Sequence, residues 1–280
     1  MALDDLSYCA EQVRQFDHDR FLTAIFAPAA VREHLFALYA FNIELAKVRE
    51  VVTEPLIGQM RLQWWRDTLD RLYAGETVAH EVARPLQAAT RAGGVARGAF
   101  DPLIDAREFD LEKSPPADLD ALLGYAEGTG APVLAIALQI AGGGADTAEI
   151  ARKAGRGWAL TGLLRALPFH ARRHRLYLPA DRLAEAGVRV SRLFDLKPEP
   201  GLRTVVRAVG ERARADFAEA RKLVGQLPKA GRSPALLIEL GRMYLTDLER
   251  AGWDPLALET RPPRRLAAAR LALASILKGY

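Results

Sequence analysis

The stretch AAVREHLFALYAFNIELAKVREVV, residues 29–52, decides the fold class. It contains neither glycine nor proline, and apolar side chains recur in it at steps of three or four residues, among them Leu35, Leu38, Leu45 and Val48. That spacing places these side chains on one face of an α-helix. The stretch therefore predicts a long helix with one buried face.

The rest of the chain repeats this pattern, because alanine, leucine and arginine dominate and β-branched runs are scarce. Further helices are expected at 59–74, 82–92, 102–110, 119–128, 131–141, 148–167, 202–227, 234–251 and 264–277. The apolar run 131–141 predicts a fully buried central helix, which the glycines at 142–144 end. Without an internal repeat or a low-complexity linker, the prediction is a single all-α domain over residues 1–280.

Composition excludes several classes of function. The net charge of +4 is compatible with an anionic ligand or a membrane surface, but it is too diffuse to indicate nucleic-acid binding. Cys9 is the one cysteine, so neither a disulfide framework nor a structural zinc site is expected. The N-terminus MALDDLSYCAEQ is acidic and unlike a signal or transit peptide, and no uninterrupted apolar run is long enough to span a membrane. We expect a cytoplasmic protein, with peripheral contact to the inner membrane as an open alternative.

Two polar stretches are candidate binding sites. In residues 41–54, Glu44, Lys47 and Glu50 lie on adjacent helical steps beside Arg49. They either form a solvated face laced by ion pairs or line a cavity between helices.

The second stretch is LRALPFHARRHRLYLP, residues 164–179. His170 and His174 have the spacing of a metal-binding pair, but Pro168 interrupts the helix and the neighbouring arginines would repel a cation. The remaining alternatives are a basic surface loop and an anion site, in which guanidinium groups hold a phosphate.

Three longer stretches, residues 21–41, 109–130 and 155–179, resemble the squalene/phytoene synthase family. The resemblance covers about residues 20–270 and implies an isoprenoid-synthase-type helical bundle around a deep central cavity. Active members condense two prenyl diphosphates, using Mg²⁺ held by two Asp-x-x-x-Asp pairs on facing helices. Carboxylates one turn apart point the same way, which suits them to hold the metal.

This chain departs from both pairs. The resemblance places the first pair at Ala46 and Glu50 and the second at Ala166 and His170, so three of the four carboxylates are missing. No metal and no cofactor is therefore expected. Instead, the resemblance and the basic residues together predict direct recognition of a phosphate or another anion. The candidate residues are Tyr39, Glu44, Lys47, Arg49, Arg165, His170, Arg172, Arg173 and Tyr177.

The departures themselves resemble a divergent branch of the family. NIELAKVRE, RLQWW and RALPFHARRHRLYLP are similar to the mitochondrial assembly factors of respiratory complex I, which keep the fold without a demonstrated synthase activity. This implies a non-catalytic role in complex I assembly, with complex I subunits or assembly intermediates as partners and an isoprenoid or prenyl diphosphate as ligand. Without a transit peptide, the chain is expected to be a bacterial relative or a processed protein of the mitochondrial matrix.

Two alternatives remain open at this point. One is an active prenyl diphosphate transferase with a rearranged Mg²⁺ site, and the other is a carrier of isoprenoids or other lipids. The C-terminal stretch 261–280 has a basic start and an apolar helical face, so it predicts a closing core helix or a membrane-docking helix.

Overall fold

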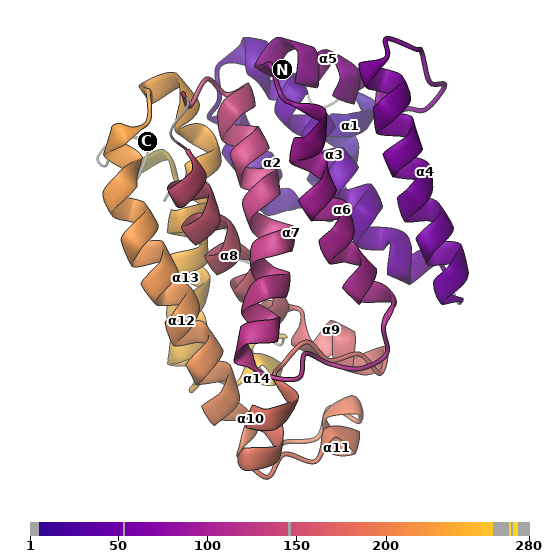
Figure 1. Ribbon diagram of the computed structural model, residues 1–280. Helices are drawn as coiled ribbons and strands as arrows, with labels where there is room; N and C mark the ends of the chain where they lie inside the picture. The colour runs from indigo at the N-terminus through magenta and orange to yellow at the C-terminus, as the bar shows by residue number, and fades with distance from the viewer. Residues whose placement is uncertain (1–5, 53, 145–146, 260–268, 270, 274–280) are drawn as a thin grey trace.

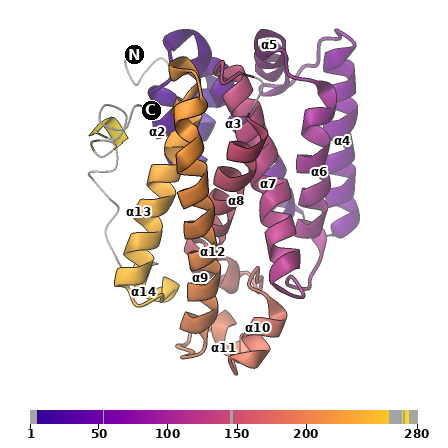
Figure 2. The same ribbon diagram turned by 60° about the vertical axis from the view of Figure 1, so that its left-hand side comes forward.

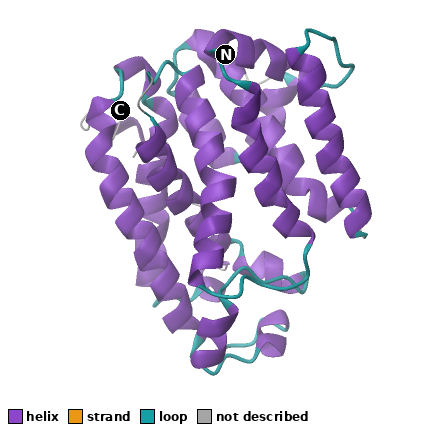
Figure 3. Cartoon of the chain, viewed as in Figure 1, coloured by secondary structure: helices purple, strands orange, loops and turns teal. Residues whose placement is uncertain are grey.

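The computed structural model describes residues 6–52, 54–144, 147–259, 269 and 271–273. Regular structure within these residues is helical throughout, with no strand (Figure 3). The predicted all-α fold is confirmed.

The first half of the chain forms one side of the bundle (Figure 1). Its helices are α1 (Tyr8–Phe16), α2 (His18–Ile25), α3 (Ala29–Val51), α4 (Pro55–Tyr73), α5 (Ala83–Gly93) and α6 (Asp101–Glu108), with 3₁₀ turns η2 (Arg97–Phe100) and η3 (Phe109–Leu111). They share one hydrophobic core. At its centre the Phe41 ring packs edge-on against Trp65 and Phe100, at centroid distances of 4.9 and 5.4 Å. The helix predicted at 29–52 is thus the central element of this half.

The second half forms the other side (Figures 1 and 2). Its long helices are α7 (Leu119–Ile140), α8 (Ala148–Arg165), α12 (Leu202–Leu223) and α13 (Leu237–Arg250). The short ones are α9 (Leu167–Arg172), α10 (Ala180–Glu185), α11 (Val190–Phe194), α14 (Pro255–Glu259), η4 (Val224–Gln226), η5 (Lys229–Gly231) and η6 (Ser233–Leu236). Both views place α9, α10, α11 and α14 at one end of the bundle.

Helix α7 lies between the two halves and contributes to both cores, with Leu134 in one and Val133 in the other. It corrects the prediction of two separate helices at 119–128 and 131–141, because it continues through Pro132. Burial on two sides stabilises the continuous helix more than the missing proline N–H weakens it. It is long and apolar enough to cross a membrane, but over half of its apolar stretch is buried here, as expected of a core helix.

Helix α7 also crosses α8 at very short range. A Cβ atom on Gly130 would lie 2.1 Å from the carbonyl oxygen of Gly155, so only glycine fits at this position. The close crossing fixes α8, and with it the beginning of the basic stretch 164–179, relative to the rest of the bundle.

Other boundaries differ from the prediction in local ways. Helix α4 begins at Pro55 rather than at 59, since proline is favourable in the first turn of a helix. The helix predicted at 148–167 ends at Arg165, and Leu167 begins the separate helix α9. Helix α1 was not predicted, although Ser7 caps it by accepting a hydrogen bond from the Ala10 N–H. The helix predicted at 264–277 lies outside the described residues, except for 269 and 271–273.

Candidate functional site

A group of buried polar side chains lies where α2, α3 and α8 approach one another. Tyr39 and Asn42 occupy successive turns of α3, and both are at least nine-tenths buried. The Asn42 Oδ1 atom has no hydrogen-bond partner among the described residues. The Tyr39 hydroxyl makes no hydrogen bond of normal geometry there, although the Thr23 side chain is its close polar neighbour. Burial raises the pKa of Tyr39, so the hydroxyl keeps its proton and can donate it to an acceptor.

Arg20 of α2 completes this group. Its guanidinium carbon is 5.6 Å from the centre of the Tyr39 ring and 6.0 Å from the centre of the Trp158 ring of α8. Its Nη1 atom donates to Asp17 at 2.6 Å, while its buried Nε has no partner in the described part of the chain. We call Arg20, Tyr39, Asn42 and Trp158 the interior polar cluster. A buried polar atom without a partner is costly, so this cluster is suited to a polar group that arrives with a ligand.

The first degenerate pair lies further along α3. Ala46 carries a methyl group at a position where the resemblance places a metal ligand, and Glu50, one turn later, is exposed to solvent. Glu44, two residues before Ala46, is half-buried.

The two cations of this segment have local partners. The Lys47 Nζ atom lies 3.0 Å from the centre of the Phe16 ring, and desolvation lowers the pKa of Lys47. The Arg49 Nη1 atom donates to the Val52 carbonyl at 3.1 Å.

The second degenerate pair, Ala166 and His170, lies at the junction of α8 and α9 and on α9. Arg165, the last residue of α8, donates to Asp19 at 2.8 Å, and its guanidinium stacks 3.5 Å from the centre of the Tyr244 ring. Tyr244 in turn donates to the other oxygen of Asp19 at 2.5 Å. Ala166 forms the junction between the two helices and offers no ligand atom. The predicted anion-binding Arg165 is thus already paired with a carboxylate in this structure.

His170 is largely buried on α9. Its ring centre is 4.8 Å from that of Tyr177, and burial lowers the pKa of His170 to about 4, helped by the charges of Arg175 and Arg173. The imidazole is therefore neutral near pH 7 and can donate one hydrogen bond, but it adds no positive charge. The Arg173 guanidinium stacks 3.7 Å from the centre of the Phe169 ring, and Arg172 is exposed.

Tyr177 belongs to a second buried network, centred on Asp110 at the end of η3. Tyr177 and Tyr125 donate their hydroxyls to Asp110 Oδ1 at 2.6 and 2.8 Å, and Arg107 Nη1 donates to Oδ2 at 3.1 Å. Arg175 donates to the Tyr177 hydroxyl at 2.8 Å and also to two backbone carbonyls near η3. We call Asp110, Arg107, Tyr125, Tyr177 and Arg175 the Asp110 network. It ties α6 and α7 to the segment that follows α9.

The predicted residues thus fall into different surroundings. Tyr39 belongs to the interior polar cluster, Arg165 to the pair with Asp19, and Tyr177 to the Asp110 network. The sequence reasoning missed Arg20, Asp19 and Asp110, because their importance depends on contacts between distant helices. The predicted deep central cavity remains a prediction.

The residues at the degenerate motif positions do not fit Mg²⁺. Magnesium requires oxygen ligands, and of the four positions Glu50 alone supplies them, while Ala46 and Ala166 end in methyl groups. Within the described residues, no three side chains of histidine, cysteine, aspartate or glutamate come together as a metal-ion site.

Comparison with known proteins adds to this geometry. The family model described as "Squalene/phytoene synthase" matches residues 13–270. The chain is 30% identical to the bovine (Bos taurus) protein "NADH dehydrogenase (ubiquinone) complex I, assembly factor 6" over 249 residues, which cover 88% of this chain and 74% of the relative. It is 28% identical to the "Presqualene diphosphate synthase" of Rhodopseudomonas palustris over 225 residues, covering 79% of each.

Two solved structures share the fold. The squalene synthase HpnC from Alicyclobacillus acidocaldarius superposes with a TM-score of 0.77 at 22% identity, covering 88% of this chain and 94% of the other. A dehydrosqualene synthase in complex with a ligand superposes with a TM-score of 0.83 at 18% identity, covering 98% of this chain and 96% of the other. The predicted isoprenoid-synthase-type bundle is confirmed.

Proposed function

Because the chain belongs to the squalene/phytoene synthase family, we propose that it is a non-catalytic member that supports the assembly of respiratory complex I. It acts on the inner face of the membrane that contains complex I, with complex I subunits or assembly intermediates as its partners. Its interior polar cluster binds the polar end of an isoprenoid or related anionic ligand without a metal. The 30% identity to a complex I assembly factor across most of the chain supports the assembly role.

The loss of the metal ligands carries the non-catalytic part of this proposal. Ionisation of a prenyl diphosphate leaves a concentrated negative charge on the departing diphosphate, and Mg²⁺ neutralises it in active members. Methyl groups at Ala46 and Ala166 cannot hold that metal, and His170 is neutral and largely buried. The fold is retained, but the means of stabilising the leaving group is not.

The ligand-binding part rests on the atoms that the fold leaves unpaired. A hydroxyl, a phosphate oxygen or a carboxylate located between α2 and α3 could accept hydrogen bonds from Tyr39 and Arg20. A hydroxyl or amide there could donate to Asn42. Hydrogen bonds to otherwise unsatisfied buried groups contribute about 1–3 kcal/mol each.

Deleting the gene from its own organism tests the assembly role. We expect fully assembled complex I and NADH:ubiquinone oxidoreductase activity to fall, and both to recover when the gene is restored. An Ala46→Lys variant, which cannot form a metal site, should restore them equally well. Normal amounts of assembled complex I in the deletion strain would contradict the proposal.

Thermal unfolding with farnesyl or geranylgeranyl diphosphate tests the ligand and the chemistry together. Ligand present at about 100 times its dissociation constant should stabilise the fold by about 2.7 kcal/mol. We expect this stabilisation to be equal in Mg²⁺ and in EDTA, and no condensation product to form. Stabilisation that requires Mg²⁺, together with product, would instead establish the transferase alternative.

A further inference from the structure

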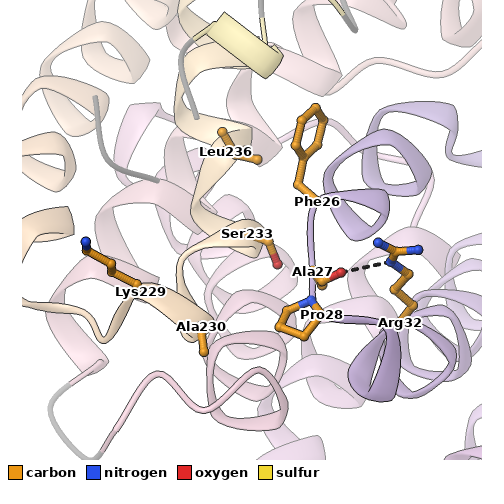
Figure 4. Close-up of a pocket in the computed structure, with 8 residues that line it drawn as sticks. All are labelled: Phe26, Ala27, Pro28, Arg32, Lys229, Ala230, Ser233 and Leu236. Atoms are coloured by element: carbon orange, nitrogen blue, oxygen red, sulfur yellow. Dashed lines mark hydrogen bonds between the residues drawn. The ribbon is translucent and has the colours of Figure 1, made fainter. Parts of the chain in front are cut away.

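A pocket with a volume of 440 Å³ lies at the opposite end of α3 from the degenerate metal motif (Figure 4). Its walls come from the segment that joins α2 to α3 and from η5 and η6. Position 29 begins α3, and a helix rises 1.5 Å per residue, so the pocket lies about 25 Å along the helix from Ala46. Tyr39 lies about 15 Å along the same helix, and no member of the interior polar cluster or of the Asp110 network lines the pocket.

A serine at the wall of this pocket has an unsatisfied hydroxyl. Ser233 is 5% exposed, and its Oγ atom has no hydrogen-bond partner among the described residues. Figure 4 shows the hydroxyl directed toward Ala27 and Pro28 on the opposite wall. A buried hydroxyl without a partner costs free energy, and a ligand atom in the pocket would remove that cost.

Positive potential surrounds the same space. Arg32 donates from Nε to the Ala27 carbonyl at 2.8 Å, which holds the guanidinium at the pocket wall. Its two terminal nitrogens form no hydrogen bond or ion pair within the described part of the chain, so they can bind an anion in bidentate fashion. Lys229 also lines the pocket, although Figure 4 shows its ammonium group directed away from Ser233, and no lining residue is acidic.

The N-terminus of α3 adds to this potential. Pro28 is the N-cap residue and provides no side-chain hydrogen bond, and the first turn contains no acidic residue. The first N–H groups of a helix lack partners within the helix and form its positive end. The Val31 N–H already donates to the Pro28 carbonyl at 3.0 Å, so the contribution of α3 is the positive potential of its N-terminal end beside Pro28, which lines the pocket.

The serine side of the pocket is held rigidly. Arg232, next to Ser233, donates to the carbonyls of Leu227 and Gly225 at 2.7 and 3.0 Å. Gly231 packs so closely on the end of α7 that a Cβ atom there would lie 2.5 Å from Gly143. These contacts hold the backbone on either side of Ser233 in place before any ligand arrives.

From this arrangement we propose that the pocket binds a phosphate monoester with an apolar organic part. The phosphate accepts hydrogen bonds from Ser233 and Arg32 near the positive end of α3, while the organic part packs on Phe26 and Leu236. This site does not rest on the proposed assembly role, and its test does not involve complex I or a diphosphate.

Isothermal titration of the full chain with hexyl phosphate, and separately with inorganic phosphate, tests the site. We expect one saturable site for hexyl phosphate and binding of inorganic phosphate weaker by about tenfold, because the apolar contact is absent. Arg32→Gln should weaken hexyl phosphate binding by at least about tenfold and Ser233→Ala by about three- to tenfold. Arg61→Gln removes an exposed arginine on α4, away from the pocket, and should leave the affinity unchanged.

Thermal stability distinguishes a binding role from a structural one. Ser233→Ala should not lower the melting temperature without ligand, since it removes an unpaired hydroxyl. The proposal is overturned if hexyl phosphate shows no saturable binding up to about 10 mM. It is also overturned if Ser233→Ala binds as tightly as the wild type, or if Arg61→Gln weakens binding as much as Arg32→Gln does.

Discussion

The two places where the resemblance puts a metal motif differ in their surroundings, and only the first keeps a carboxylate, that of Glu50. On α3 the helix continues unbroken past Ala46 and Glu50, and the interior polar cluster beside it keeps polar atoms without partners. At the other place α8 ends at Arg165, and the Asp110 network joins the segment after α9 to α6 and α7. Both oxygens of the Asp110 carboxylate are paired there, although the buried Arg107 Nε atom has no partner among the described residues.

This difference suggests different roles for the two regions: ligand recognition for the interior polar cluster and stabilisation of the fold for the Asp110 network. Polar atoms that are already paired with one another stabilise the fold and have little left to offer a ligand, whereas unpaired buried atoms weaken the free protein and favour a bound one. We therefore expect substitutions in the Asp110 network to change stability, and substitutions in the interior polar cluster to change binding.

The largest expected effect comes from Asp110→Ala. The substitution leaves the Arg107 guanidinium buried without its carboxylate, and it removes the acceptor of both Tyr125 and Tyr177. Breaking a buried ion pair by removing one partner costs about 3–5 kcal/mol. Urea-induced unfolding, followed by circular dichroism, measures this loss.

Asp105→Ala is the matched control, on helix α6 directly before η3. Asp105 pairs with Arg66 at 2.6 Å, but its side chain is 63% exposed, so its removal should cost less than about 1 kcal/mol. Equal costs for the two variants would show that the Asp110 network adds no more stability than an exposed ion pair.

Acid should weaken the same region through His170. Its pKa in the folded protein is about 4, below the ordinary value of 6.5, so the unfolded chain binds a proton in this interval that the folded chain does not. The stability contributed by the neutral imidazole is complete above pH 6.5 and is lost as the pH falls toward 4, by up to about 3 kcal/mol.

The free energy of unfolding measured at several pH values between 4 and 7 tests this. His170→Gln should flatten the dependence in this range, since glutamine does not titrate. His18→Gln, on helix α2, serves as the control substitution for the loss of an imidazole. A variant without His170 that keeps the full slope would assign the acid sensitivity to other groups.

The sequence predicted what depends on residue identity and on helical periodicity. The long helix at 29–52 could be predicted because its apolar positions repeat with the period of a helix. The loss of metal ligands at Ala46 and Ala166, where the resemblance places them, follows from residue identity alone. The continuity of α7 could not be predicted, because Pro132 is accommodated by burial between two cores that only the folded chain creates.

The partners of the site residues could not be predicted from the sequence either. Arg165 finds its carboxylate in Asp19, 146 positions away along the chain, and Tyr177 donates to Asp110 across 67 positions. Local spacing carries no information about such contacts, which depend on how the helices pack. For that reason the sequence placed Arg165 and Tyr177 in one anion site, whereas the structure gives them separate surroundings.

A smaller effect is expected for Tyr177→Phe. The variant keeps the ring and removes the hydroxyl that donates to Asp110 and accepts from Arg175. Leaving these buried partners unsatisfied should cost about 1–3 kcal/mol. Urea unfolding measures the loss, and the affinity for farnesyl or geranylgeranyl diphosphate should not change. A loss of affinity without a loss of stability would place Tyr177 in the binding site.

The smallest effect on stability is expected for Tyr39→Phe, which is the same chemical change in the other region. The Tyr39 hydroxyl makes no hydrogen bond of normal geometry among the described residues, with the Thr23 side chain as its polar neighbour. Its removal should therefore change the free energy of unfolding by less than about 0.5 kcal/mol, or raise it slightly. The ligand-induced thermal stabilisation should nevertheless fall, because the hydroxyl is then missing from the complex. If Tyr39→Phe destabilises the free protein as much as Tyr177→Phe does, the two regions are alike in this respect. The Tyr39 hydroxyl would then no longer be evidence for a ligand-binding site.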